Sequence, residues 1–361
     1  MSLGFRNEIG ITVWLAGCSI ADVAILPRSR PPVMRLFAGR PPSSVLPVLP
    51  RLFSLCAVAQ QVAYLSAVEA ARGEDAAAET VQRRVTAVVA ERLTELVRGL
   101  FVGQLALDGT GTAAVRALMQ AATVLGRVAS KGARGGAMHE AVSQIRSALI
   151  ALWNQPPEPG RAGAATPLAS FDADALSFPA VEQSFLSVAD DPDVVVRLLT
   201  EGASFSGAPE LHGRIPETGV WARRSGREQS LPLDAGPAER LKARVAEVAR
   251  LLAWLDDAER DPEVGVIASY SLGNRRGAAA VECARGRLYH AMELDDENRI
   301  VRFEFLAPTE WNFHARGPLV RSLKGSLLAA GQRGQDAVRT LVGSFDPCVG
   351  FSLNFHEAGC A

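Results

Sequence analysis

The sequence has few aromatic residues, no surplus of either charge and no long hydrophobic run. Phe, Trp and Tyr make up 6% of its 361 residues, which disfavours a platform for stacking nucleic-acid bases. The 38 Lys and Arg residues against 39 Asp and Glu give a net charge of −1. This balance argues against binding through phosphate contacts and against attraction to anionic membranes. No apolar run reaches the roughly 20 residues that a membrane-spanning helix needs.

Cysteine is also scarce, and its spacing disfavours two common uses. The number of cysteines is odd and no two are spaced as CxxC, so neither a disulfide framework nor a structural zinc site is supported. Free thiols of this kind predict a cytoplasmic protein. The five are Cys18, Cys56, Cys283, Cys348 and Cys360.

The remaining composition, 48% hydrophobic, is sufficient for a substantial core. Apolar residues at three- and four-residue steps predict helices, and the segments that we expect to be helical are 52–71, 81–100, 112–130, 139–154, 237–255, 318–331 and 333–345. Residues 266–270 and 300–305 read as strands, with a turn at 295–298. We predict a helix-rich α+β fold in a single domain over residues 1–361, with an exposed loop at 155–167.

The N-terminal region permits two interpretations. Residues 15–18, LAGC, resemble the cleavage box of a lipoprotein signal, but the preceding apolar stretch is short, and Arg6 and Glu8 mix the charges at its start. We favour a first β-strand over residues 11–15. Frequent prolines over the first fifty residues exclude a long helix there.

Several segments resemble motifs of the nickel–iron hydrogenase large subunits, and they occur in the order found in that family. The resemblance implies the large-subunit fold, with a central helical bundle and small peripheral β-sheets. The segments are 39–41 (similar to GRDP), 50–56 (RICGVC), 217–223 (ETGPLAR), 282–290 (EAPRGxLxH), 308–312 (P(S/T)TWN) and 346–348 (the DPC of DPCxxCxxH).

The departures from the family pattern fall on the residues that bind nickel and carry protons. Phe53 and Phe351 stand where the family has cysteines, and Asn354 stands at its closing histidine. The glutamate of the family's proton relay falls on Met34. Nickel needs its thiolates and a proton path needs a titratable group. We therefore predict a protein without nickel and without hydrogenase activity, which is not an enzyme.

The iron half of the family's site is retained. The family's iron carries two cyanides and one carbon monoxide, and the resemblance makes Cys56 and Cys348 its ligands. Arg285 and Thr309 take the positions that donate hydrogen bonds to the cyanides, and Leu288 is the apolar neighbour of the carbon monoxide. This pattern resembles the HupK/HoxV group of hydrogenase accessory proteins. The role implied is a scaffold on which the Fe(CN)2CO unit is assembled or held.

The same resemblance implies partners: a HypC-type chaperone and its hydrogenase-specific relative, a HypD-type assembly protein and a hydrogenase large-subunit precursor. Two other functions stay open. One is a divergent hydrogenase-like oxidoreductase with a mononuclear iron site, and the other is a metal-free protein that binds large-subunit maturation partners.

The residues themselves permit simpler interpretations. Cys56 and Cys348 could be inert buried thiols, Arg285 could form an ion pair with Glu282 or Glu293, and Thr309 could be an ordinary turn hydroxyl. The shared-iron hypothesis predicts instead that Cys56 and Cys348 lie close together, with Arg285 and Thr309 in the same pocket. Cys360 and His356 are candidate auxiliary ligands. We expect packing roles for Cys18 and Cys283 and a structural role for His290. We expect a solvated face formed by Arg223, Arg224 and Arg227.

Overall fold

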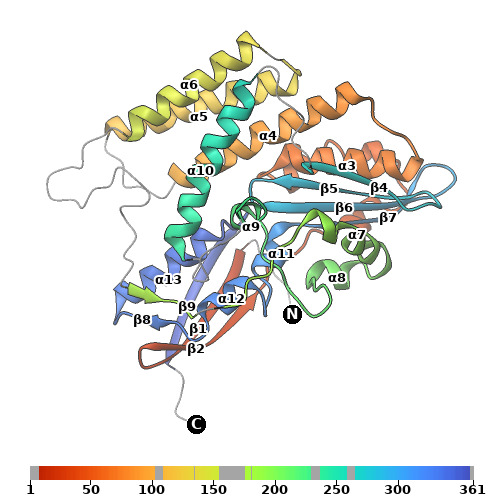
Figure 1. The fold of residues 1–361 in the computed structure, drawn as a ribbon. Coiled ribbons are helices and arrows are strands. Elements are labelled where there is room, and N and C mark those ends of the chain that lie inside the picture. The colour runs from red at the N-terminus through yellow and green to blue at the C-terminus, as the bar shows by residue number, and fades with distance from the viewer. Residues whose placement is uncertain are drawn as a thin grey trace.

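The computed structural model describes residues 8–101, 109–133, 135–153, 175–179, 181–228, 236–257 and 265–357. Figure 1 shows a helical bundle at one end of the molecule, a four-stranded sheet beside it, and a five-stranded sheet at the other end. The helix-rich α+β fold with small sheets confirms the predicted fold class. The loop predicted at 155–167 lies outside the described residues. None of the described helices is both long and apolar enough to cross a bilayer.

The bundle is built from helices whose apolar residues recur at helical spacing. In α4 the buried stripe runs from Val85 through Leu93 to Leu100, as predicted, whereas Val81 is exposed on the first turn. Helix α10 begins with Pro237 at its first position, where a missing N–H has no consequence. The helices are α3 (Ala57–Arg72), α4 (Ala78–Phe101), α5 (Gly109–Ser130), α6 (Gly136–Trp153) and α10 (Pro237–Asp256).

The four-stranded sheet is an antiparallel meander in the order β4-β5-β6-β7. Both faces are covered, because Leu288 and Met292 of β6 pack on the side of α3, while Tyr289 and Ala291 pack on the side of α7 (Asp191–Thr200). The predicted turn at 295–298 connects β6 to β7. The strands are β4 (Ile267–Ser271), β5 (Arg276–Cys283), β6 (Gly286–Leu294) and β7 (Ile300–Leu306).

Helix α3 lies very close to β5, and Gly277 permits this contact. A Cβ at position 277 would lie 2.1 Å from the backbone nitrogen of Ala71. A side chain there would push the helix away from the sheet.

The five-stranded sheet joins the two ends of the described chain. Its order is β3-β8-β2-β1-β9, and β9 pairs with β1 in parallel. The predicted strand at 11–15 lies within β1. Cys18, expected to pack, is exposed because it lies in the tight turn between β1 and β2. The strands are β1 (Glu8–Ala16), β2 (Ser19–Leu26), β3 (Leu176–Ser177), β8 (Leu327–Leu328) and β9 (Gly350–Glu357).

The helix predicted over 318–331 is wrong beyond its first turns. Helix α12 (Pro318–Leu323) ends where Gly325 takes a φ of 83°, and the chain then forms β8. Helix α13 (Gln332–Ser344) confirms the next prediction. The other short helical segments are α1 (Val33–Phe37), η1 (Pro42–Ser44), α2 (Leu49–Leu52), η3 (Val188–Asp190), α8 (Ala203–Gly207), α9 (Val220–Ser225) and α11 (Pro308–Asn312).

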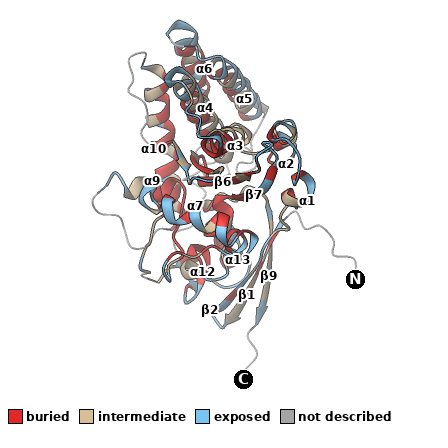
Figure 2. Cartoon of the chain, turned by 90° about the vertical axis from the view of Figure 1, so that its right-hand side faces the viewer, coloured by how far each residue is buried: buried red, intermediate tan, exposed pale blue. Residues whose placement is uncertain are grey.

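The main core lies where the bundle meets the four-stranded sheet. Its buried residues come from the long helices and from β5 and β6, and they include Cys56 and Cys283. In Figure 2 buried residues fill the middle of the molecule around α3 and β6, while exposed residues line the outer sides of α5 and α6. The two cysteines thus belong to the region that joins helices to sheet.

Candidate metal-binding cavity

A cavity of about 150 Å³ lies between the start of α3, the β5–β6 turn and the start of β9. This is well above the roughly 10–15 Å³ that one water molecule needs. Its lining includes four residues singled out from the sequence: Cys56, Cys348, Arg285 and Leu288. The walls are completed by Arg28, residues 52–55, Gln60, Cys283, Ala307, Pro308, Val349 and Gly350.

Cys56 is held at the start of α3 by an unusual cap. Its backbone is left-handed, with φ 58°, and its own side chain does not cap the helix. Glu91 of α4 takes that role, accepting hydrogen bonds from the backbone N–H groups of Val58 and Ala59 at 2.7 and 2.9 Å. Burial is the main cause that raises the pKa of Glu91 to about 7. This arrangement leaves the Cys56 thiol to face the cavity.

Arg285 lies in the β5–β6 turn and places its guanidinium beside Cys56. Its Nη1 lies 3.4 Å from Cys56 Sγ and 3.0 Å from Glu95 Oε2. Its Nε is buried without a hydrogen-bond partner and lies 3.6 Å from Asp346 Oδ2. Burial acts to lower the pKa of Arg285, but the surrounding anionic groups raise it, so the group is a cation. The alternative ion pairs with Glu282 or Glu293 are wrong, because Arg285 pairs with Glu95 and Asp346.

Cys348 precedes β9 and is hydrogen-bonded to Thr309, with 2.9 Å between Sγ and Oγ1. Thr309 is not among the residues that line the cavity, which differs from the prediction that it shares a pocket with Arg285; it reaches the cavity only through its bond to Cys348. Burial raises the pKa of the Cys348 thiol, while Arg28 and the bond to Thr309 act in the opposite direction. Arg28, which pairs with Glu310 at 3.2 Å, gives the cavity a second cation. No feature of the sequence near residue 28 marks it as part of the site.

Cys283 is the third sulfur of the cavity. It ends β5, is 2% exposed and lines the cavity together with Cys56 and Cys348. Two causes raise the pKa of Cys56 well above its usual value. The larger is the interaction with the Cys283 thiol, and the second is burial. The expected packing role is thus incomplete, because the thiol also faces the cavity. Within the described ranges, no three His, Cys, Asp or Glu side chains are already arranged to hold a metal ion.

Three segments that resemble family motifs, 217–223, 282–290 and 308–312, contact one another next to Arg285. A Cβ at Gly286, where φ is 132°, would lie 2.4 Å from Thr218 Oγ1, and a Cβ at Gly219 would lie 2.9 Å from the carbonyl oxygen of Arg285. Asn312 accepts from the Thr218 N–H at 3.0 Å and donates to the Thr218 carbonyl at 2.9 Å. These close backbone contacts fix the turn that carries Arg285.

Arg223 is a second support for this turn, which corrects its expected place on a solvated face. Its guanidinium donates to the carbonyl oxygens of Cys283 and Ala284 at 3.1 and 3.0 Å. It also donates to the carboxylates of Glu282 and Glu247 at 2.6 and 3.1 Å. The side chain is only 11% exposed, so Arg223 ties the end of β5 to the helices.

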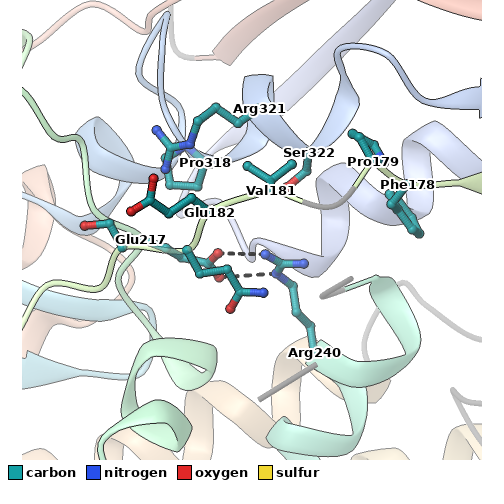
Figure 3. Close-up of a pocket in the computed structure, with 11 residues that line it drawn as sticks. Phe178, Pro179, Val181, Glu182, Glu217, Arg240, Pro318, Arg321 and Ser322 are labelled. Carbon is teal, nitrogen blue, oxygen red and sulfur yellow. Dashed lines mark hydrogen bonds and ion pairs between the residues drawn. The ribbon is translucent and has the colours of Figure 1, made fainter. Parts of the chain in front are cut away.

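A second pocket, shown in Figure 3, is too small for a metal complex. Its volume of about 30 Å³ is sufficient for about two water molecules, which need roughly 10–15 Å³ each. Arg240 donates to both carboxylate oxygens of Glu217, at 3.2 and 2.7 Å, and both side chains are buried. The pair anchors the segment that precedes Thr218, which is a structural role.

The two histidines singled out from the sequence, His290 and His356, are not part of the cavity lining. His290 is buried and bonded to Gln60, with 2.5 Å between Nε2 and Oε1, and burial lowers its pKa to about 3, which confirms a structural role. His356 lies on the exposed face of β9, where its ring stacks on Trp14 at 6.3 Å, and it does not line the cavity. Cys360 lies outside the described residues. Phe53 lines the cavity.

Comparison with known proteins gives relatives of full length. A family model for nickel-dependent hydrogenase matches residues 239–353. The hydrogenase expression/formation protein HupK of Bradyrhizobium diazoefficiens is 64% identical, covering 100% of both chains. HupK of Rhizobium leguminosarum bv. viciae is 33% identical over 98% of each chain. HoxV of Cupriavidus necator is 27% identical over 90% of each.

Solved structures share the fold at low sequence identity. A Ni-Fe-Se hydrogenase chain from D. vulgaris Hildenborough superposes with a TM-score of 0.60 at 15% identity, covering 93% of this chain and 95% of that one. A [NiFeSe]-hydrogenase chain from Dm. baculatum gives 0.59 at 16% identity, with 96% and 97% covered. These matches confirm the hydrogenase-like fold that the motifs implied.

Proposed function

Because this chain belongs to the HupK family of hydrogenase expression/formation proteins, we propose that it acts in hydrogenase maturation as a scaffold that holds or transfers the Fe(CN)2CO unit. The unit is cargo and does not remain in the protein. Acceptors of this cargo, by the same reasoning, are hydrogenase large-subunit precursors, and its donors are HypC-type and HypD-type assembly proteins.

The observation that carries the proposal is the convergence of Cys56, Cys348 and Arg285 on one cavity. The three come from the start of α3, the segment before β9 and the β5–β6 turn, far apart in the chain. The thiols supply soft sulfur donors for iron. The Arg285 guanidinium, whose Nη1 lies 3.4 Å from Cys56 Sγ, is a charged donor of the kind from which a cyanide nitrogen accepts a hydrogen bond. Leu288 gives the cavity an apolar wall.

The cavity lacks the residues for hydrogen turnover. Phe53 lines it at a position where the family has a nickel cysteine. Phe351 is a half-buried strand residue of β9, and Met34 on α1 offers only its thioether, which accepts from the N–H of Phe303 at 2.7 Å. A thioether does not relay protons. We therefore propose a non-catalytic role.

Infrared spectroscopy tests the scaffold directly. The full-length chain would be produced together with its accessory proteins and purified without oxygen. We expect cyanide and carbonyl bands in the wild type, and their loss in Cys56→Ala and Cys348→Ala. Cys18→Ser is the control, because Cys18 is exposed and does not line the cavity, and it should keep the bands.

The alternatives predict different results in the same preparation. A metal-free binding protein would bind large-subunit maturation partners without showing any cyanide or carbonyl band. A hydrogenase-like oxidoreductase would reduce a dye with hydrogen. Either result would overturn the scaffold proposal.

A further inference from the structure

Cys283 is a buried cavity sulfur to which the hydrogenase resemblance assigns no role. The corresponding position in the family pattern EAPRGxLxH is alanine, so the thiol is a feature of this chain. It lines the same cavity as Cys56 and Cys348, and it belongs with Cys56 to one buried core cluster. Buried sulfurs that line one cavity are a suitable ligand set for a soft metal.

Both Cys283 and Cys56 are held by rigid elements. Cys283 ends β5, and Arg223 donates to the carbonyl oxygen of Cys283 at 3.1 Å and to that of Ala284 in the following turn at 3.0 Å. Cys56 begins a helix whose first turn is clamped by Glu91, at 2.7 and 2.9 Å. Metal sites depend on ligands that are fixed in this way by surrounding hydrogen bonds. The pair is therefore supported as a ligand set would be.

We propose that Cys283 is a third sulfur ligand for the metal of the cargo, beside Cys56 and Cys348, an inference that rests on the proposed function. In an octahedral iron centre, three diatomic ligands leave three positions open. Two cysteines fill only two of them, and Cys283 supplies the third. The described residues hold no three His, Cys, Asp or Glu side chains already arranged around a metal, so this proposal requires the three sulfurs to move together when the metal binds.

The loading step is a ligand exchange without electron transfer. As each sulfur–iron bond forms, the S–H bond of that cysteine breaks and its proton passes to solvent. The ligand that held the iron in the donor leaves, and the iron stays ferrous. The guanidinium groups of Arg28 and Arg285, both at the cavity, offset the negative charge of the added thiolates.

Cobalt(II) is a suitable probe, since it binds thiolates and gives sulfur-to-metal charge-transfer absorption. It would be titrated into the full-length, metal-free wild type and into Cys283→Ser. We expect the absorption per bound cobalt to fall by about one third in the variant, as three sulfurs become two. The control Cys18→Ser should equal the wild type.

X-ray absorption at the cobalt edge of the wild type removes any dependence on how the variant folds. Three sulfur neighbours in the wild type would support the inference, and two would overturn it. An unchanged cobalt spectrum in Cys283→Ser would overturn it as well.

The infrared experiment decides the proposed function separately. If cyanide bands appear and the cobalt spectrum does not depend on Cys283, the scaffold proposal stands and the proposal of a third sulfur ligand is wrong. If cobalt binding depends on Cys283 but the protein never shows cyanide bands, Cys283 is a metal ligand and the scaffold proposal is wrong.

Discussion

Because of Glu91, the free energy of unfolding of this protein should fall as the pH rises from about 4.5 to about 7. Its carboxyl group accepts two backbone N–H bonds at the start of α3, yet burial, with the neighbouring charge of Glu95, raises its pKa from 4.5 to about 7. The two backbone bonds and Arg285 oppose this shift without cancelling it. In the unfolded chain the carboxyl group ionises at its ordinary value.

The sign and the size of the pH effect follow from the difference between the pKa of Glu91 in the folded and in the unfolded chain. Below pH 4.5 Glu91 is protonated in both states, and its contribution to the free energy of unfolding is fully present. As the pH rises towards 7 the unfolded chain releases the proton and the folded chain keeps it, so the contribution is lost. A shift from 4.5 to about 7 corresponds to about 3 kcal/mol.

Urea unfolding of the wild type and Glu91→Gln at pH 4.5, 6, 7 and 8 measures this contribution. Gln keeps an oxygen acceptor for one of the two α3 N–H groups and does not titrate, so the loss of the second bond is an offset that does not change with pH. The wild-type free energy of unfolding minus that of the variant should fall by about 3 kcal/mol across the series. Glu79→Gln, an exposed position on the same helix, is the control and should show no such trend. A difference for Glu91→Gln that stays constant with pH would refute the reasoning.

Three further predictions concern the cavity and its frame. Arg285→Leu should remove most of the cyanide and carbonyl infrared intensity and Arg285→Lys should remove less, because Lys keeps the charge without the forked donors; wild-type bands in Arg285→Leu would contradict the cyanide-pocket assignment. Gly277→Ala should lower the free energy of unfolding by about 1–3 kcal/mol, measured by urea denaturation, because its Cβ would meet the backbone of Ala71; an unchanged midpoint would contradict the close packing of α3. The natively purified chain should contain no stoichiometric nickel by elemental analysis, because Phe53 and Phe351 replace sulfur ligands.

The sequence predicts those parts of the structure that depend on neighbouring residues in the chain. The stripe of α4 and the Pro-initiated start of α10 have a visible period and a visible first residue, and both helices are present. The predicted end of the helix at residue 331 is wrong, because α12 ends at Leu323. Apolar residues continue after Leu323 at a spacing that also suits the two-residue strand β8.

The cavity was predictable only where contiguous motifs mark it. Cys56, Arg285 and Cys348 lie in segments that resemble family motifs, so their numbers could be read directly. Glu91 and Arg28 reach the site by tertiary approach from α4 and from the segment after β2, and local sequence carries no sign of this. Arg223 was misplaced for the same reason, since its carboxylate partners come from α10 and β5.

The parallel pairing of β1 with β9 has a consequence for the order of events during synthesis. Residues 8–15 pair with residues 350–357, so this pairing must wait until residues 350–357 have left the ribosome. Cys348 lies two residues before β9 and is positioned by it. A nascent chain that has folded its helical bundle and its four-stranded sheet therefore presents Cys56 and Cys283 in an open, unfinished cavity. Contacts between such distant segments form late and slowly, which makes closure of this sheet the step that completes the cavity.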